Sequence, residues 1–375
     1  MSAEVSVPPA RRSITASPIF GKIAASLVAL FISFLLGALL VLALGESPLE
    51  VYGLLISGSL VGMPNFLVTL QMMSPLIFTG LAVAISFRAG LANIGAEGQM
   101  LVGALCAGYV GYAVELPALI HLPLCLLAAF VGGLVWALLP ALLRVYLNVN
   151  EIVVCLMMNP IALLLTGYLS TRVLKAPGPT NKLPDIQPTA ELSTFSLFSQ
   201  ANTGLIFALV LCLIFAVVNV RTMRGFEWQM IGKNAKFAYY GGVDVRRRAL
   251  TVFLVSGGIA GLAGAEQVLG QYRAYYDDFS PGYGFDGIAV AMLAQFNPLA
   301  VPLAALLFGA LNGGSAVLQM MTGLSKHLVQ VLQFIVVLVL AAKLSWDWLK
   351  LGRSQTAAPG SDPPAEGPHV TAGDR

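Results

Sequence analysis

The sequence predicts an all-α, polytopic membrane protein, and three observations support this fold class. Apolar residues make up 57% of the 375 residues and charged residues only 10%, whereas soluble domains average about 45–50% and about 25%. Apolar runs close to the roughly 20 residues that a helix needs to cross a bilayer recur along the chain. Most connections between these runs are short and polar. A chain this poor in charge cannot cover a surface that faces water, so we expect hydrocarbon to surround it.

About ten apolar segments follow one another, and we expect each to be a helix that crosses or partly enters the membrane. These segments are residues 19–44, 66–87, 101–114, 116–143, 152–169, 203–218, 250–269, 285–297, 299–318 and 328–342. Residues 285–297 are too short to cross alone, which predicts a broken or partial helix buried among its neighbours. We expect residues 46–65 to form a short amphipathic connection.

The two ends of the chain differ from its apolar part. Residues 1–18 are polar, and residues 354–375 are rich in Pro, Gly and Ala. Segments of this composition do not bury enough apolar surface to fold. We therefore expect disordered cytoplasmic tails at both ends and a transmembrane domain at residues 19–346.

Positive charge predicts the orientation of the chain. Residues 221–248, which we call the basic loop, hold seven Lys or Arg side chains but only two acidic ones, Glu227 and Asp244. Short loops rich in Lys and Arg stay in the cytoplasm, so we expect this loop inside and the polar connection at residues 171–202 outside. Each half of the chain then contributes five segments, and the halves have opposite topology. Such an inverted repeat is an architecture that transporters use.

Residues 86–100 interrupt the hydropathy with glycines and polar side chains. Asn93, Glu97 and Gln99 lie here, and polar groups at membrane depth are costly and usually face a cavity or a partner. One interpretation is a discontinuous helix whose side chains, together with Phe87, line a solute path. The other is a cytoplasmic turn in which Asn93 caps the following helix. The residues alone leave both interpretations open.

Two further polar residues interrupt apolar runs. Asn159 is expected to form a hydrogen bond with a neighbouring helix. Asp286 is expected either to cap a helix or to line the solute path. The candidates for that path are therefore Phe87, Asn93, Glu97, Gln99, Asn159 and Asp286.

Other kinds of site are not indicated. The sequence has no GxxxxGK[S/T] phosphate-binding motif, so no site for nucleotide hydrolysis is visible. The four cysteines lie in apolar runs without paired spacing, so neither a metal site nor a disulfide framework is expected. No nucleophile, base and orienting acid are grouped, which disfavours an enzyme. The basic residues lie between membrane spans, which disfavours nucleic-acid binding. We expect no cofactor.

Five stretches together resemble one family. They are GLAVAISFRAGLANIGAEGQMLVGA (80–104), NVNEIVVCLMMN (148–159), MRGFEWQMIGKNAKFAYYGGVDVRRR (223–248), SGGIAGLAGAEQVLG (256–270) and GFDGIAVAMLAQFNPLAV (284–301). The family is the ABC importer permeases for nucleosides and simple sugars, which are similar to ribose and branched-chain amino-acid permeases. The likeness covers residues 48–343. The AGLxNIGxEGQ form resembles the first of the two dissimilar permeases of purine-nucleoside-type importers.

The resemblance implies partners and a cellular location. A second permease chain would complete a heterodimer, and two ATP-binding domains would sit at its cytoplasmic face. An extracytoplasmic substrate-binding protein would deliver the solute across a bacterial inner membrane. The basic loop would be the coupling segment that contacts the ATPase, and residues 235–240 would form a short helix ended by Gly241 and Gly242. Its motif positions are Arg224, Gly225, Gly232, Asn234, Ala235, Ala238 and Gly241.

Alternative functions follow from the same observations. Within transport, the solute is expected to be a nucleoside or a related small molecule, and the alternatives are a monosaccharide and a branched-chain amino acid. An ion-coupled secondary transporter would also use broken helices and inverted repeats. The basic loop could be a plain loop that follows the positive-inside rule. In the coupling interpretation, Lys236 and Phe237 stand where the family usually has small residues, which predicts a matched ATPase partner.

Overall fold

The computed structural model describes residues 18–196, 199–323, 327–335 and 338–339. Its helices are α1 (Pro18–Ala43), α2 (Pro48–Leu60), α3 (Met63–Arg88), α4 (Ala96–Ala113), α5 (Ala118–Leu147), α6 (Glu151–Tyr168), α7 (Gly204–Arg221), α8 (Met223–Lys233), α9 (Ala235–Tyr240), α10 (Val245–Glu266), α11 (Tyr283–Leu293) and α12 (Val301–Thr322). The short elements are η1 (Leu169–Val173), η2 (Pro188–Ala190), η3 (Gln267–Tyr272) and the antiparallel strands β1 (Thr194–Ser196) and β2 (Ser199–Asn202). The predicted all-α class is confirmed. The expected tails lie outside the described residues, except for Pro18, with which α1 begins.

The number of membrane spans differs from the expected ten. Among the described residues, six helices are long and apolar enough to cross a bilayer: α3, α5, α6 with η1, α7, α10 with η3, and α12. A seventh crossing results if α1 and α2, which bend by 117° relative to each other, count as one broken span. The count of ten is therefore not confirmed. One contribution to the difference is α11, which has only 11 residues.

Helix α2 occupies the place of the expected amphipathic connection at residues 46–65. It begins with Pro48, whose fixed φ and missing N–H suit the first turn of a helix. Val51 and Leu55 are buried with Leu311 and Leu318 of α12 in one apolar cluster. The segment is amphipathic, as expected, but its apolar side makes it a packed helix.

Helix α10 packs at the centre of the bundle, against α3, α4 and α5. Small residues allow this close approach. A Cβ on Gly261 would come within 3.2 Å of the Cα of Gly133 on α5, and one on Gly264 would come within 2.8 Å of the Cβ of Ala104 on α4. The glycines of α10 therefore set the distances between the helices that surround the candidate site.

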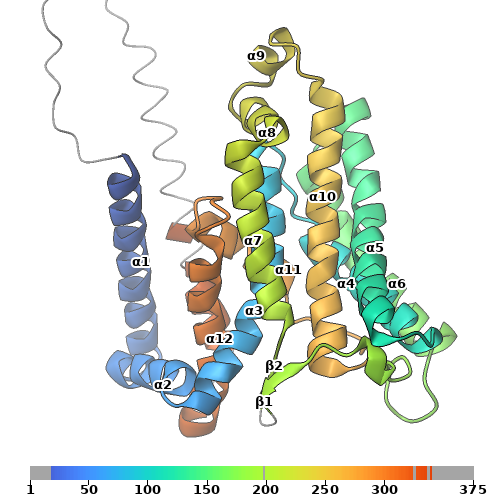
Figure 1. Cartoon of the computed structure of the whole chain (residues 1–375). Helices are drawn as coiled ribbons and strands as arrows, with labels where there is room; N and C mark the ends of the chain where they lie inside the picture. Colours follow the sequence, from blue (N-terminus) through green and yellow to red (C-terminus); the bar gives the residue numbers. More distant parts are fainter. Residues whose placement is uncertain (1–17, 197–198, 324–326, 336–337, 340–375) are drawn as a thin grey trace, which may run out of the picture.

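The polar parts of the chain lie at opposite ends of the bundle (Figure 1). Helices α8 and α9 of the basic loop are at one end, and the β1–β2 hairpin and the rest of the 171–202 connection are at the other. Backbone hydrogen bonds fasten this connection to the chain beyond α10. The amide of Leu183 donates to the carbonyl of Tyr275, and that of Ile186 donates to the carbonyl of Arg273, each at 2.9 Å. The structure thus separates the two regions that are predicted to lie on opposite sides of the membrane.

Candidate functional site

The helical structure of residues 86–100 is interrupted, as one of the two interpretations predicted. Helix α3 ends at Arg88 and α4 begins at Ala96, and the seven non-helical residues between them, 89–95, are called the break below. Gly90 has φ +75°, a conformation that glycine adopts without strain. The residue at the N-cap of α4 is Gly95, so the expectation that Asn93 caps this helix is wrong in detail. The side chain of Asn93 instead accepts a hydrogen bond from the Gly95 amide at 3.1 Å.

A buried pair of carboxamides fixes the break to its neighbours. Asn93 Nδ2 donates to Gln99 Oε1 at 2.8 Å, and Gln99 Nε2 donates back to Asn93 Oδ1 at 2.9 Å. Asn93 Nδ2 also donates to Ser256 Oγ of α10 at 2.8 Å, and Ser256 Oγ donates to the carbonyl of Ala82 on α3 at 2.6 Å. All three polar side chains are at most 1% exposed. The chain thus satisfies these groups internally, as a water-free environment demands.

Helix α6 holds the break from the other side. Asn159 Nδ2 donates to the carbonyl of Ile94 at 3.1 Å, and Asn159 Oδ1 accepts from the amide of Gly98 at 3.0 Å. Two helical turns earlier, Glu151 Oε1 accepts from the amide of Ala92 at 3.2 Å. These two side chains replace the intrahelical partners that the break removes from the backbone. Asn159 was expected to bond a neighbouring helix, and its actual partners are backbone groups of the break and the first turn of α4.

Glu97 joins two helices that begin side by side. It lies in the first turn of α4 and is 8% exposed, and its Oε2 accepts a hydrogen bond from the amide of Gly284 at 2.6 Å. Gly284 lies in the first turn of α11, and a Cβ there would collide with the backbone of Glu97. A carboxylate suits this position because the positive ends of both helix dipoles meet there. The first turns of α4 and α11 therefore form one unit around Glu97.

Helices α4 and α11 run in opposite directions from this meeting point. At the far end of α4, Gly111 accepts a hydrogen bond from the amide of Gln187 in the outer connection, at 2.8 Å. Beyond the far end of α11, the ring of Phe296 stacks on Phe87 of α3, with 5.1 Å between ring centroids. An inverted repeat would produce this opposed pair, although the repeat itself stays a prediction.

The side chains of the remaining two candidates have other partners. Phe87 is in the last turn of α3, next to the break, and its ring stacks on Phe296. Asp286 is in the first turn of α11 and does not cap it, because the N-cap residue is Gly282. Asp286 Oδ2 accepts a hydrogen bond from Asn312 Nδ2 at 3.4 Å. Side-chain hydrogen bonds therefore join Asn93, Glu97, Gln99 and Asn159 to the break and the adjoining helix starts, but not Phe87 or Asp286.

Sequence reasoning missed several partners of these residues. Ser256 contacts Asn93, and Asn312 contacts Asp286. Glu151 contacts the Ala92 amide of the break. None of these three was expected to bind a candidate residue or the break. The signal that could have found them is an isolated polar side chain in or at the edge of an apolar run, the same signal that selected Asn159 and Asp286.

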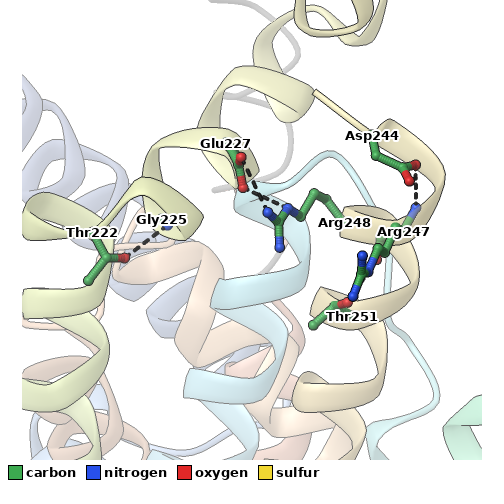
Figure 2. A network of polar contacts seen from close by, with 7 residues as sticks. All are labelled: Thr222, Gly225, Glu227, Asp244, Arg247, Arg248 and Thr251. Carbon is green, nitrogen blue, oxygen red and sulfur yellow. Dashed lines mark hydrogen bonds and ion pairs between the residues drawn. The ribbon is translucent and has the colours of Figure 1, made fainter. Parts of the chain in front are cut away.

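The basic loop folds into helices, each of which begins at a capping side chain. Thr222 Oγ1 accepts from the amide of Gly225 at 3.2 Å at the start of α8. Asn234 Oδ1 accepts from the amide of Phe237 at 3.0 Å at the start of α9. Asp244 Oδ1 accepts from the amide of Arg247 at 3.0 Å at the start of α10 (Figure 2). Such caps are worth about 1 kcal/mol each. The predicted short helix at 235–240 is confirmed.

An ion pair joins α8 to α10 (Figure 2). Arg248 Nε lies 2.6 Å from Glu227 Oε2, and both side chains are partly buried. Among the described residues, no other basic side chain of the loop forms an ion pair. The loop thus keeps its internal geometry with one pair and leaves its remaining positive charge available to a negatively charged partner.

Helix α9 presents aromatic side chains at the end of the molecule. Phe237, Tyr239 and Tyr240 are 64%, 69% and 85% exposed. Ala238 is fully buried with Ile231 and Val243, which anchors the helix. A surface groove of about 1050 Å³ runs beside α9 and the start of α10. The residues that line it are Ala235, Lys236, Tyr239, Tyr240, Gly242, Val243, Asp244, Val245 and Arg246.

The basic loop and the break approach each other closely at two glycines. A Cβ on Gly90 would lie 3.1 Å from the Cα of Gly232, and a Cβ on Gly232 would lie 3.0 Å from the carbonyl carbons of Arg88 and Ala89. The last turn of α8 therefore rests directly on the start of the break. Gly225, in the first turn of α8, allows a similar close approach to α7, since a Cβ there would lie 2.5 Å from the Cα of Asn219.

This fold, a bundle of apolar helices with a broken helix in contact with a helical platform at one end, fits a membrane permease. The chain belongs to the family described as "Branched-chain amino acid transport system / permease component", which matches residues 65–341. It is a multi-pass membrane protein.

Individual relatives are similar over most of the chain. The guanosine ABC transporter permease protein NupP of Bacillus subtilis is 37% identical over 323 residues, which cover 84% of this chain and 92% of NupP. The glucose ABC transporter permease protein TsgB13 of Haloferax volcanii is 33% identical over 389 aligned positions, which cover 100% of this chain and 99% of TsgB13. The nucleoside ABC transporter permease protein NupB of Lactococcus lactis is 30% identical over 305 residues, with 78% of this chain and 84% of NupB covered.

All three of these organisms contribute a further permease match, at 26–27% identity. NupQ of B. subtilis, a guanosine ABC transporter permease protein, is 27% identical over 251 residues and covers 65% of this chain. NupC of L. lactis, a nucleoside ABC transporter permease protein, is also 27% identical over 251 residues and covers 63%. This chain is therefore less similar to NupQ than to NupP, and less similar to NupC than to NupB.

Proposed function

We propose that this chain is a transmembrane permease subunit of an ATP-driven importer that moves nucleosides or a related small solute into the cytoplasm. The observation that carries the proposal is the contact between Gly232 and Gly90, which joins a water-exposed platform to a broken helix inside the membrane. A closure of ATP-binding domains against α9 would move α8, and α8 would push on the start of the break. The names of NupP and NupB support the class of solute.

The proposed assembly has four kinds of component. Two ATP-binding domains contact the basic loop through the exposed aromatics of α9 and the motif positions Arg224 and Asn234. A second, dissimilar permease chain completes the pathway, which the matches to NupP and NupQ and to NupB and NupC support. An extracytoplasmic binding protein docks on the outer connection, and a bacterial inner membrane holds the complex. ATP hydrolysis is assigned to the ATP-binding domains, since the sequence of this chain contains no GxxxxGK[S/T] phosphate-binding motif.

The candidate residues have two different proposed roles. Asn93, Glu97, Gln99 and Asn159 hold the break and the start of α11 in place, since their hydrogen bonds are made within the chain. Asp286 faces the solute path. A monosaccharide is the second candidate solute, because the glucose permease TsgB13 is similar along the whole chain.

Reconstitution tests the proposal. The chain would be co-expressed with the ATPase, second permease and binding protein encoded beside it and placed in proteoliposomes. We expect uptake of labelled guanosine that requires ATP and the binding protein, and that persists when an ionophore removes ion gradients. The chain reconstituted alone is expected to show neither uptake nor ATP hydrolysis. Uptake by the isolated chain, or uptake that an ion gradient drives without ATP, would contradict the proposal.

A further inference from the structure

A row of polar side chains leads from the outer end of α12 to Asp286. Asn312, Ser315 and Gln319 are three and then four residues apart, so they share one face of α12. Gln319 is exposed, Ser315 and Asn312 are half-buried, and Asn312 contacts Asp286. We call these four residues the polar stripe. Because α12 ends on the side of the β1–β2 hairpin (Figure 1), the stripe runs from the outer end toward the start of α11.

The hydrogen bonds at the inner end of the stripe have a fixed direction. An ionised carboxylate only accepts, so Asn312 must donate its Nδ2 protons to Asp286 Oδ2, at 3.4 Å. The amide oxygen of Asn312 then accepts from Gln333 Nε2 at 2.9 Å, and Gln333 is only 2% exposed. Within the described part of the chain, Asp286 Oδ1 receives no hydrogen bond. One carboxylate oxygen of Asp286 thus has a hydrogen-bond donor in the described part of the chain, and the other can accept a hydrogen bond from a ligand.

The surroundings of Asp286 are those of a pathway rather than of a lipid-facing surface. Asp286 is half-buried, its neighbour Phe285 is 42% exposed, and no described Lys, Arg or His forms an ion pair with Asp286. An acidic side chain at membrane depth is costly against hydrocarbon and is found facing water-filled cavities or partners. The face of α11 and α12 that carries the stripe is therefore unsuited to hydrocarbon and suits water or a partner chain, such as the second permease that completes the proposed path.

We propose that Asp286, positioned by Asn312 and Gln333, binds vicinal hydroxyl groups of the solute as it passes through the membrane. The proposal rests on the proposed function and narrows its solute class. Guanosine and glucose, which appear in the names of NupP and TsgB13, each have a pair of neighbouring hydroxyls. A carboxylate accepts hydrogen bonds from both, as acidic residues do at ribose in dinucleotide-binding folds. Phe285, one residue before, offers an aromatic face to a base or sugar ring.

The site is also linked to the break. Asp286 stands two residues after Gly284, whose amide is held by Glu97. A movement of the break would shift the first turn of α11 and carry the Asp286 carboxylate with it. Binding of the hydroxyls would accordingly differ between the two arrangements of the transporter, as alternating access requires.

The test compares the hydroxyl discrimination of transporter variants. Discrimination is the ratio of the concentrations of unlabelled 2′,3′-dideoxyguanosine and unlabelled guanosine that halve ATP-dependent uptake of labelled guanosine. The binding protein is the same in all samples, so its own preference cancels when variants are compared. Hydrogen bonds to a charged group contribute about 1.5–3 kcal/mol, so we expect Asp286→Asn to reduce the ratio about tenfold or more. Asn312→Ala, which leaves the carboxylate but removes its donor, should reduce it less.

Two outcomes separate the inference from the proposed function. If the unaltered complex shows no ATP-dependent guanosine uptake, the proposed function fails. If that uptake is present but Asp286→Asn and Asn312→Ala keep the original ratio, the inference fails while the proposed function stands. Glu50→Gln, which removes an exposed carboxylate from the first turn of α2, outside the stripe and the outer connection, is the matched control and should leave the ratio unchanged. If Asp286→Asn does not assemble into a complex that hydrolyses ATP, Asn312→Ala decides, and an unchanged ratio in that variant overturns the inference.

Discussion

The break and the basic loop both interrupt apolar runs with glycine and asparagine, but polar side chains have opposite uses in the two regions. At the break, inward-facing polar side chains bond the backbone groups that would otherwise need water, as Asn159 of α6 does with Ile94 and Gly98. In the basic loop, side chains cap short helices and aromatic rings remain exposed. The comparison shows that a polar residue near a membrane is a recognition candidate only where its hydrogen-bonding capacity is incomplete.

The largest expected effect concerns the internal bonds of the break. Asn159→Ala leaves the Ile94 carbonyl and the Gly98 amide without partners, and each unsatisfied buried group costs about 1–3 kcal/mol. We expect the free energy of unfolding to fall by roughly 2–5 kcal/mol and the melting temperature of the assembled complex to fall with it. Thermal unfolding in detergent measures this. Asn181→Ala in the outer connection is the control, since its side chain is exposed, and equal melting of both variants would contradict the comparison.

The next effect concerns the point where the two regions touch. Gly232→Val places a side chain against the backbone of Arg88 and Ala89, and overpacking of this kind costs about 1–3 kcal/mol. Because the contact transmits motion in the proposed function, ATP hydrolysis should continue while uptake per ATP falls about tenfold. Parallel assays of both rates in proteoliposomes measure the ratio.

Gly241→Ala provides the control for that prediction. It adds a Cβ to the same loop, but the nearest atoms would be 3.4 Å away, an ordinary contact distance. Its backbone φ is −77°, which any residue adopts. Although Gly241 is also a motif position of the loop, uptake per ATP should therefore fall much less than in Gly232→Val. If Gly241→Ala and Gly232→Val lose coupling equally, the backbone contact with the break is not the route.

A smaller effect is expected at the ion pair between α8 and α10. Glu227 and Arg248 are partly buried and 2.6 Å apart, so a double-mutant cycle should give a coupling energy near the upper end of the range for exposed pairs, about 1 kcal/mol. Either Glu227→Gln or Arg248→Gln should lower uptake per ATP about threefold or less, and the double variant should be no worse than either single one. Strictly additive losses would show that the pair does not act as a unit.

The sequence was most informative where structure depends on neighbours along the chain. Residues 235–240 form the predicted helix because a capping Asn234 precedes them and glycines follow. The break was visible in its glycines and in the loss of hydropathy. Contacts such as Asn93 with Ser256 join residues 163 positions apart, and only the packing of α10 brings them together. Helix α2 was missed as a helix because its 13 residues are too short to cross a membrane, although they suffice to pack on α12.

The smallest effect should come from the cap of α9, and it tests the loop without touching the break. Asn234→Ala removes the acceptor for the Phe237 amide, at a cost of about 0.5–1 kcal/mol of helix stability. A helix of six residues is marginally stable, and apart from the buried Ala238 the cap is its main anchor. Amide hydrogen exchange should therefore rise several-fold at residues 235–240 and stay unchanged at residues 89–95. Coupling should fall less than in Gly232→Val. Thr222→Ser, which keeps a capping hydroxyl on α8, is the control. Faster exchange in the break would mean that α9 and the break share one cooperative unit, and that the two regions are less separate than their contrasting use of polar groups indicates.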